Sequence, residues 1–276
     1  MTSFKLSAFG DEIDDDLETQ LSVLEAENVH FLELRGAWGH GVLDLDATQL
    51  KRCSDLLRTH GCGVSAIGSP IGKSDIDQSR AFELERLDRA INAAQVLGTA
   101  LIRVFSFYIP KGEAAKYRGE VLERMASLAE RAQQEGVTLV HENEHGIYGD
   151  VPERCRDILV KVNSPALRNA FDPANFVVDH VKPMVDAWPQ LAEYTTHVHI
   201  KDAIFADGTI RPAGEGDGDV AGLIQALLDS HYAGFLTLEP HLKYAGPFGG
   251  VSGADGMRIA IHALRKLLTQ AGVTAI

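Results

Sequence analysis

Eight short apolar segments alternate with helical patterns along the chain, and this alternation restricts the fold more than any other feature. The segments are residues 5–9, 29–34, 62–67, 100–105, 137–142, 167–172, 195–200 and 234–238. Their length is typical of β-strands, whereas apolar residues between them recur every three or four positions, as on one face of a helix. Alternating strands and helices predict a parallel sheet, either closed into a (β/α)8 barrel or open and doubly wound.

Glycines mark the ends of four of the predicted helices. Gly61, Gly98, Gly136 and Gly234 each separate a helical pattern from the strand that follows. Glycine readily adopts the left-handed conformation that ends many helices. Because the chain holds eight such units and no linker or low-complexity stretch, we expect an α/β fold of the (β/α)8 TIM barrel type, with residues 1–276 forming a single domain.

Local signals place the starts of three further helices. Pro152 is expected to open one, since proline lacks the N–H that a first helical position leaves unused. Asp219 is expected to cap another, because its carboxylate accepts hydrogen bonds from a first turn. A third helix is expected over residues 181–191, beyond Pro183.

The chain is strongly acidic, which restricts its partners. It has 26 Lys and Arg against 39 Asp and Glu, so its formal net charge is 26 − 39 = −13. Such a chain is a poor candidate for binding nucleic acid phosphates or an anionic membrane. The acids of residues 11–16 are interpreted as a solvated helix start, with Asp11 and Glu12 exempted because they lie nearest the strand end. We expect a small-molecule partner, no nucleic acid and no membrane, and leave a homo-oligomer open.

The three cysteines predict no disulfide framework. They are Cys53, Cys62 and Cys155, widely spaced and without a Cys-x-x-Cys pair. This pattern is typical of reduced, structural thiols. The N-terminal residues lack the apolar core of a signal peptide, and no apolar run approaches membrane-spanning length. We therefore expect a cytoplasmic protein.

Four metal-binding side chains stand at the ends of consecutive predicted strands. Glu142 and Asp172 end strands five and six, His199 lies at the end of strand seven, and Glu239 directly follows strand eight. Because the carboxyl ends of barrel strands meet at one face, these residues would surround half of the barrel mouth. One imidazole and three carboxylates form a mixed nitrogen and oxygen ligand set. The sequence therefore predicts a site for one divalent metal ion at this face.

His197 stands two residues before His199 and therefore shares its side of the strand. It is expected one layer deeper in the barrel. We interpret His197 as a hydrogen-bonding residue beneath the metal site rather than as a ligand.

Motifs around these residues resemble the xylose isomerase-like TIM barrel superfamily of sugar isomerases and epimerases. They are His141-Glu142-Asn143, Phe171-Asp172, His197-Val198-His199-Ile200-Lys201-Asp202, Gly214-Glu215-Gly216 and Leu238-Glu239. The resemblance implies that Glu142, Asp172, His199 and Glu239 bind one divalent ion, such as manganese, magnesium, cobalt or zinc. It also implies that the two glutamates act as acid and base.

This site predicts a metal-dependent sugar or sugar-acid isomerase or epimerase. Carboxylates would move a proton while a metal stabilises the enediolate. A dehydratase (lyase) of a keto-sugar or keto-inositol is the alternative, since it needs nearly the same residues. A non-catalytic sugar-binding protein is disfavoured because all four ligand positions are filled.

The superfamily also includes endonuclease IV-like phosphodiesterases, which is the least favoured interpretation. The third and fourth strands lack the terminal histidines of that pattern. Asn175 stands where the nuclease pattern has a histidine, and Arg211 where it has a further acid–histidine pair.

Further residues near the strand ends are expected to bind substrate. They are His145, Arg211, Asn175, Glu33, Arg35 and Lys201. Arg35 and Arg103 would suit an anionic substrate, although Arg103 equally fits a structural ion pair. Asp202 is expected in the layer behind the site, where it would orient Arg211 or a ligand.

Overall fold

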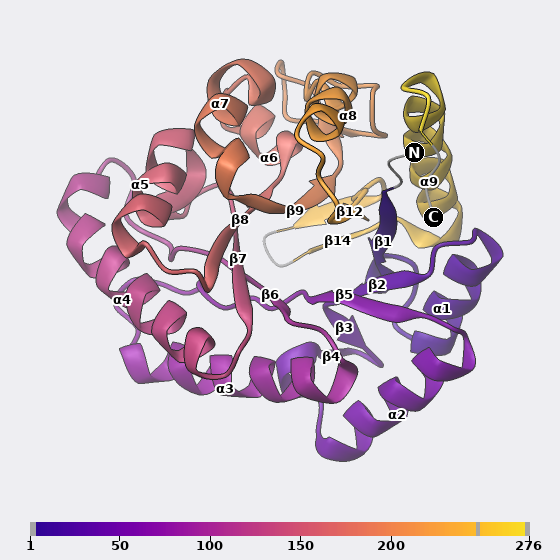
Figure 1. Cartoon of the computed structure of the whole chain (residues 1–276), viewed down its shortest axis with the longest axis horizontal. Coiled ribbons are helices and arrows are strands. Elements are labelled where there is room, and N and C mark those ends of the chain that lie inside the picture. The colour runs from indigo at the N-terminus through magenta and orange to yellow at the C-terminus, as the bar shows by residue number, and fades with distance from the viewer. Residues whose placement is uncertain (1–3, 247–248, 274–276) are drawn as a thin grey trace.

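A closed barrel of eight parallel strands forms the centre of the computed structural model, which describes residues 4–246 and 249–273 (Figure 1). The strands are β1 (Lys5–Phe9), β2 (Phe31–Leu34), β5 (Gly63–Ile67), β6 (Leu101–Val104), β7 (Thr138–Glu142), β8 (Leu167–Phe171), β9 (Thr195–Ile200) and β12 (Phe235–Leu238). Strand β1 pairs with both β2 and β12, which closes the ring. The predicted TIM barrel is confirmed, and closure excludes the open, doubly wound alternative.

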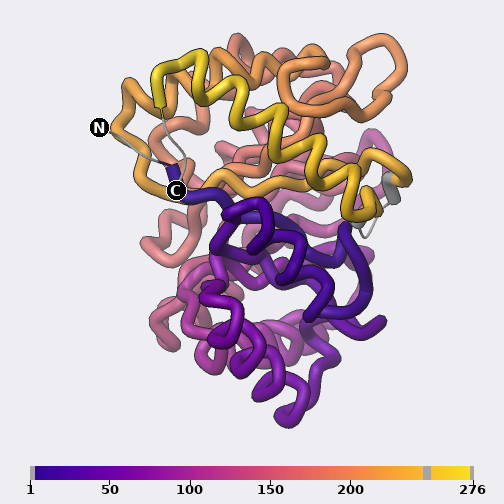
Figure 2. The backbone as a smooth tube through the Cα atoms, turned by 90° about the vertical axis from the view of Figure 1, so that its right-hand side faces the viewer, coloured from indigo at the N-terminus to yellow at the C-terminus, as the bar shows by residue number. Residues whose placement is uncertain are grey.

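Helices surround the barrel, and Figures 1 and 2 show them as an outer ring. They include α1 (Leu17–Ala26), α2 (Ala47–Thr59), α3 (Arg80–Leu97), α4 (Ala114–Gln134), α5 (Pro152–Val162), α8 (Val220–Asp229) and α9 (Gly253–Gln270). Pro152 opens α5, and the Asp219 carboxylate accepts a hydrogen bond from Gly222 N at the start of α8, as predicted. No helix in the described ranges is long and apolar enough to cross a membrane.

The helical layer between β8 and β9 is broken into short pieces. Helix α6 (Pro173–Val178) follows β8 directly, a π-helical turn covers Pro183–Ala187, and α7 (Trp188–Leu191) completes the segment. The sequence predicted helical structure beyond Pro183 but missed α6. A helix of six residues is too short to show a clear apolar period.

Three of the four predicted glycine terminators adopt the left-handed conformation. Gly61, Gly98 and Gly136 have φ angles of 60°, 74° and 71°. The prediction for Gly234 is wrong, because α8 ends earlier and His231, with φ 55°, takes the left-handed position. Gly234 instead leaves room for the Tyr232 side chain packed against it.

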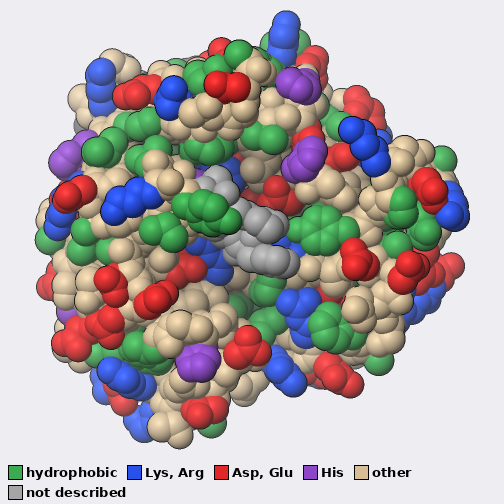
Figure 3. Space-filling view, turned by 180° about the vertical axis from the view of Figure 1, so that it is seen from behind, with side chains coloured by type: hydrophobic (Ala, Val, Ile, Leu, Met, Phe, Trp, Pro, Cys, Tyr) green, Lys and Arg blue, Asp and Glu red, His purple; other side chains and the backbone are tan. Residues whose placement is uncertain are grey.

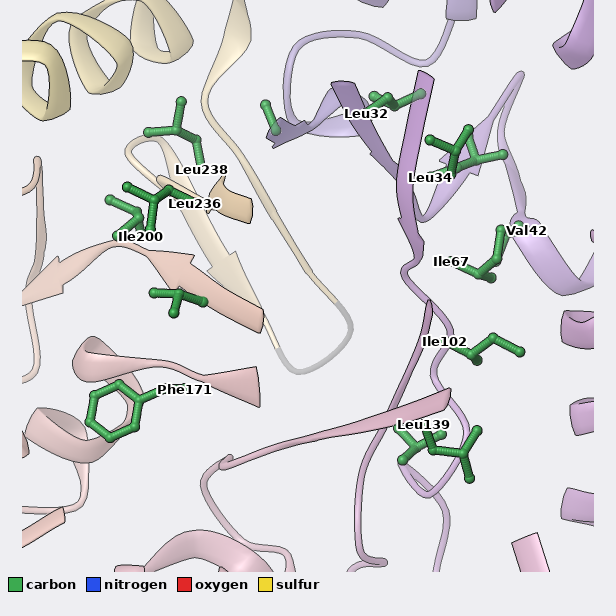
Figure 4. Close-up of a cluster of buried hydrophobic side chains, with 14 of the residues drawn as sticks. Leu32, Leu34, Val42, Ile67, Ile102, Leu139, Phe171, Ile200, Leu236 and Leu238 are labelled. Atoms are coloured by element: carbon green, nitrogen blue, oxygen red, sulfur yellow. The ribbon is translucent and has the colours of Figure 1, made fainter. Parts of the chain in front are cut away.

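The main hydrophobic core lies between the barrel and the helices. Alternate strand residues point away from the barrel axis, as Leu34, Ile102, Leu139, Phe171 and Leu236 do in Figure 4. This alternation follows from the period of two in a β-strand. The remaining strand residues face the barrel interior, where many of them are polar.

Small hairpins follow the strands at the mouth of the barrel. They are β3–β4 (Gly36–Ala37 and His40–Gly41), β10–β11 (Asp202–Ala203 and Ile210–Arg211) and β13–β14 (Tyr244–Gly246 and Gly249–Val251). Glu12 anchors both ends of the β13–β14 hairpin, since its Oε2 accepts hydrogen bonds from His241 N at 2.9 Å and Ser252 Oγ at 2.6 Å. In Figure 1, β14 lies over the barrel opening.

Candidate metal centre and adjoining cavity

Four side chains from adjacent strand ends converge at the barrel mouth. Glu142 is the last residue of β7, His199 lies in β9, Glu239 follows β12, and Asp172 caps α6 directly after β8. All four are buried, and each offers one ligand atom within 4.8 Å of the others. The structure thus brings together the four residues that the sequence analysis predicted to bind a metal ion.

The imidazole of His199 is oriented toward the carboxylates. Its Nδ1 lies 3.2 Å from Glu142 Oε1 and 3.8 Å from Glu239 Oε2, and has no hydrogen-bond partner among the described residues. Its Nε2 lies 3.3 Å from Glu33 Oε2 and likewise forms no hydrogen bond among the described residues. A carboxylate on the far side of the ring is common behind metal-binding histidines. Three carboxylates and an unpartnered imidazole nitrogen therefore fit a divalent cation.

Three buried cations hold the carboxylates in place. Lys201 Nζ lies 2.9 Å from both Asp172 Oδ2 and Glu239 Oε2. Arg35 Nη1 lies 2.9 Å from Glu239 Oε1. The third cation, Arg103, places Nη1 3.2 Å from Glu142 and 3.6 Å from Glu239, so it bridges the two glutamates. The structure thus favours the ion-pair interpretation of Arg103.

The charges of this buried group leave room for one divalent ion. Five carboxylates, those of Glu12, Glu33, Glu142, Asp172 and Glu239, are at most 3% exposed. The three cations described above oppose them, but Arg35 also pairs with Asp11 at 2.7 Å, so carboxylates outnumber cations by 6 − 3 = 3 when the histidines are neutral. Buried charges are costly unless they are compensated. A divalent cation would offset two of these charges.

The pKa values of the site residues reflect the same concentration of buried charges. Burial opposes ionisation of Glu142, but His199 and Arg103 outweigh it and lower its pKa to about 2. Burial raises the pKa of Asp172 to about 6, although Lys201 acts against that shift. Burial also opposes protonation of His199, but Glu142 and Glu33 raise its pKa to about 10. In the metal-free site, a proton on His199 thus supplies positive charge that a metal would replace.

Residues 23–267 match the family model described as the xylose isomerase-like TIM barrel. The chain belongs to this family. No curated protein sequence matches it.

Several solved structures share the fold of this xylose isomerase-like barrel. A D-tagatose 3-epimerase-like protein has a TM-score of 0.75 at 19% identity, over 97% of this chain and 100% of that one. The probable 3-DHS dehydratase AsbF from Bacillus anthracis has a TM-score of 0.74 at 18% identity, over 95% and 98% of the chains. The IOLI protein, described with a binding zinc atom, has a TM-score of 0.78 at 14% identity, over 97% and 99%. At these identities, the likeness shows the fold alone.

Beneath the four candidate metal ligands of this xylose isomerase-like barrel lies a second polar layer. His197 Nε2 is 2.7 Å from Glu33 Oε2 and 3.2 Å from Thr237 Oγ1, and all three residues are fully buried. His197 therefore lies where strand periodicity places it. Glu33, which the sequence analysis expected to bind substrate, lies in this layer and is fully buried.

Asn175 contacts the site directly. Its Nδ2 donates to Glu142 Oε1 at 3.1 Å and to the Asn143 carbonyl at 2.9 Å. Its backbone N–H donates to Asp172 Oδ1. Asn143, which the sequence analysis quoted but gave no role, exchanges two hydrogen bonds with the backbone of Asp172. These amides fix two of the four ligand residues.

The carboxylate of Asp202 organises a glycine-rich loop. Its carboxylate accepts hydrogen bonds from the backbone N–H groups of Ala203, Gly214, Gly216 and Gly218, at 2.8–3.0 Å. Asp202 and Arg211 are cross-strand partners in the β10–β11 hairpin, and the orientation of Arg211 or a ligand by Asp202 stays a prediction. The Arg211 side chain is exposed on β11.

His145 lies apart from the four ligand residues. Its side chain is 70% exposed, and Nδ1 lies 2.6 Å from Asp179 Oδ1. This hydrogen bond raises the pKa of His145.

Three residues without a predicted role complete the surroundings. His241 Nε2 lies 3.4 Å from Glu239 Oε1 and 3.2 Å from Glu12 Oε1. The Phe9 ring lies below the guanidinium groups of Arg35 and Arg103, at 4.7 and 4.9 Å. His241 lies beyond β12 with φ 46°, so strand periodicity gave no signal for it. The sequence analysis excluded Glu12 from the solvated helix start only because it lies next to the strand end.

A cavity of about 600 Å³ adjoins the metal centre. Its walls come from residues 36–44, which include the β3–β4 hairpin, from the loop after β5, and from α3. Arg35 and Arg103 belong to both the cavity wall and the ion pairs of the centre. The four candidate ligand residues thus occupy one half of the mouth, and the cavity occupies the other.

Proposed function

We propose that this protein is a divalent-metal-dependent isomerase or epimerase of a sugar or sugar acid. The main support for this proposal is a pair of buried glutamates, Glu142 at the end of β7 and Glu239 after β12, which belong to the same group of four candidate ligands. The likeness to a D-tagatose 3-epimerase-like protein supports this reaction class. Manganese, magnesium, cobalt and zinc are the candidate ions, and the zinc described in the IOLI protein supports a metal in this fold.

The residues of the site would divide the work of binding and proton transfer. Glu142, Asp172, His199 and Glu239 would hold the cation, which when bound stabilises negative charge on substrate oxygens. Glu142 and Glu239 would then remove a proton from a carbon beside the carbonyl and return it. Return to the neighbouring carbon gives an isomerase, and return to the opposite face gives an epimerase.

The ion pairs around the two glutamates suit this role. Lys201 and His241 hold the pKa of Glu239 well below its usual range, although burial acts in the opposite direction. Both glutamates are therefore ionised and can accept a proton. Arg103 fixes their spacing, and the amide of Asn175 fixes Glu142 from its other side. A preorganised pair avoids the cost of orienting the two groups during the reaction.

A dehydratase is the second candidate. The likeness to a probable 3-DHS dehydratase favours it. The same proton abstraction would then be followed by loss of a β-hydroxyl group from the substrate.

Hydrogen exchange with solvent tests these assignments. Metal-loaded protein is incubated in deuterated water with a panel of ketoses, aldoses and sugar acids, and products are followed by NMR. Deuterium uptake without dehydration supports isomerase or epimerase chemistry, whereas a new enone or ketone absorbance supports the dehydratase. No exchange, together with nicking of abasic DNA, would overturn the proposal.

Glutamine variants of the two glutamates make the test specific. Glu142→Gln and Glu239→Gln should each lower the exchange rate by about 100-fold or more, because general acid–base catalysis typically contributes that much. Glu130→Gln, on the exposed face of α4, provides a charge-matched control. Circular dichroism checks that the barrel is intact. Full exchange activity in both site variants would contradict the assignment.

A further inference from the structure

The cavity beside the metal centre is larger than one sugar ring requires. Its volume is about 600 Å³, and it reaches the ligand residues through Arg35 and Arg103. Pockets of about 300–1,000 Å³ enclose drug-sized ligands, which are bigger than a monosaccharide. A sugar that contacts the metal would therefore leave much of this space unfilled.

Four of the five cations of the cavity wall already have ion-pair partners. Arg86 Nη1 lies 3.0 Å from Glu83 Oε1, and Lys73 Nζ lies 2.7 Å from Glu144 Oε2. The two arginines shared with the metal centre are paired with its glutamates, as described above. A phosphate or carboxylate group would have to compete with these carboxylates for each cation.

The remaining charges of the wall do not favour an anion either. Among the described residues, Arg89 forms no ion pair, and neither do Asp15 and Asp44, which line the same cavity. These three groups sum to 1 − 2 = −1. On the face shown in Figure 3, acidic and basic side chains are likewise interspersed rather than segregated. Mixed carboxylates and guanidinium groups accept from and donate to neutral hydroxyl groups.

The wall also offers an apolar platform. Phe82, at the start of α3, is 41% exposed and lines the cavity. The centre of its ring lies 5.1 Å from the Arg86 guanidinium, so the ring packs beside a hydrogen-bond donor. An exposed aromatic ring next to polar groups suits a sugar ring, which has an apolar face of C–H groups and a polar edge.

We propose that this cavity is a second sugar subsite and that the preferred substrate is a neutral keto-sugar carrying a further sugar ring. The proposal rests on the isomerase or epimerase function proposed above. The carbonyl-bearing ring occupies the metal half of the mouth, and the second ring lies against Phe82 and the polar groups of the wall.

Four probes test the subsite with metal-loaded protein. They are D-fructose, its neutral glycosides isomaltulose and lactulose, and anionic fructose 6-phosphate. Exchange of substrate hydrogen with deuterated water gives kcat/KM, and calorimetry gives the dissociation constants. We expect at least one glycoside to exceed both D-fructose and fructose 6-phosphate about tenfold in kcat/KM and in affinity, because only a glycoside fills the cavity.

A cavity variant separates the subsite from the catalytic centre. Phe82→Ala should raise KM and the dissociation constant for the glycosides about fivefold while leaving those for D-fructose unchanged. Val185→Ala, an exposed apolar residue in the π-helical turn, serves as control.

The outcomes distinguish the two proposals. If kcat/KM for D-fructose or fructose 6-phosphate equals that for the glycosides, the subsite proposal is overturned and the proposed function is unaffected. An equal effect of Phe82→Ala on all substrates would also overturn the subsite. Exchange with none of the four probes would contradict both proposals.

Discussion

Lys201 is the residue on which the metal-free site most depends. Its ammonium group bridges Asp172 and Glu239, two of the four candidate ligands, and is only 4% exposed. Burial disfavours its charged form, but these carboxylates hold the pKa of Lys201 well above its usual range. Lys201 thus supplies part of the positive charge that the ligand carboxylates need.

Replacement of Lys201 should therefore destabilise the metal-free protein more than the metal-loaded one. Lys201→Met leaves two buried carboxylates without their cation, a change that costs about 3–5 kcal/mol in the free energy of unfolding. Added manganese should recover most of that loss. Urea unfolding in chelator and in manganese measures both, with the exposed Lys266→Met as control. Equal destabilisation in the two conditions would show that Lys201 does not share the role of the metal.

At the same scale, strand periodicity predicted the four ligand residues and the depth of His197. It did not predict that Glu33 lies beneath His199, because β2 and β9 are not neighbours in the barrel and lie far apart in the chain. Nor did it predict the contact between Glu12 and His241, since 229 positions separate these residues in the chain. Contacts of this kind arise only when the barrel closes.

At the scale of elements, the loop after β9 depends on glycine. Gly216 donates its backbone N–H to Asp202, and an added Cβ would lie 2.5 Å from the Ala203 carbonyl oxygen. Gly119, on the exposed face of α4, has open space around it instead. The two positions therefore respond to the same substitution in opposite ways.

Gly216→Ala should lower the free energy of unfolding by about 1–3 kcal/mol, since the loop must move to admit the methyl group. Gly119→Ala should raise it by about 0.5–1 kcal/mol, because alanine favours a helix interior. Chemical denaturation of both variants beside the wild type gives the two values. Changes of the same sign would contradict this account of the loop.

Helix ends were predictable where one residue determines them, as at Pro152, Asp219 and Gly98. The segment between β8 and β9 was not, because α6, the π-helical turn and α7 are each too short to show a helical period. Tertiary packing determines such pieces more than local sequence does.

At the scale of the whole molecule, the reactivity of the three cysteines measures whether the fold is intact in three separate regions. Burial raises the pKa of Cys53 to about 11 and that of Cys62 to about 12, and it also raises the pKa of Cys155. Thiol reagents attack the thiolate. At pH 8 the native protein should leave all three unlabelled by a disulfide reagent, whereas the urea-unfolded chain should react at three sites.

The same shifts predict the direction of the alkaline response. An unfolded cysteine ionises near pH 8.5, below the native pKa values. The thiols therefore contribute stability below about pH 8.5 that is lost as the pH rises toward 11 and 12. Rapid labelling of the native protein at pH 8 would contradict the burial of these groups.

The count of strand–helix units predicted a closed barrel, which alternation alone could not separate from an open sheet. Closure itself depends on β1 pairing with β12, where Lys5 lies beside Phe235. No local pattern contains that pairing. The position of the cavity was also not predictable, because separate segments from the first half of the chain, between Asp11 and Arg103, form it together.

Metal dependence is the most direct test of the account as a whole. Protein stripped with a chelator and then titrated with manganese should regain hydrogen exchange on its substrate in proportion to bound metal, up to one ion per chain. Elemental analysis of the same samples gives the stoichiometry. His199→Gln should abolish both binding and recovery. Undiminished exchange in the stripped protein would contradict the central claim that these four residues work through one divalent ion.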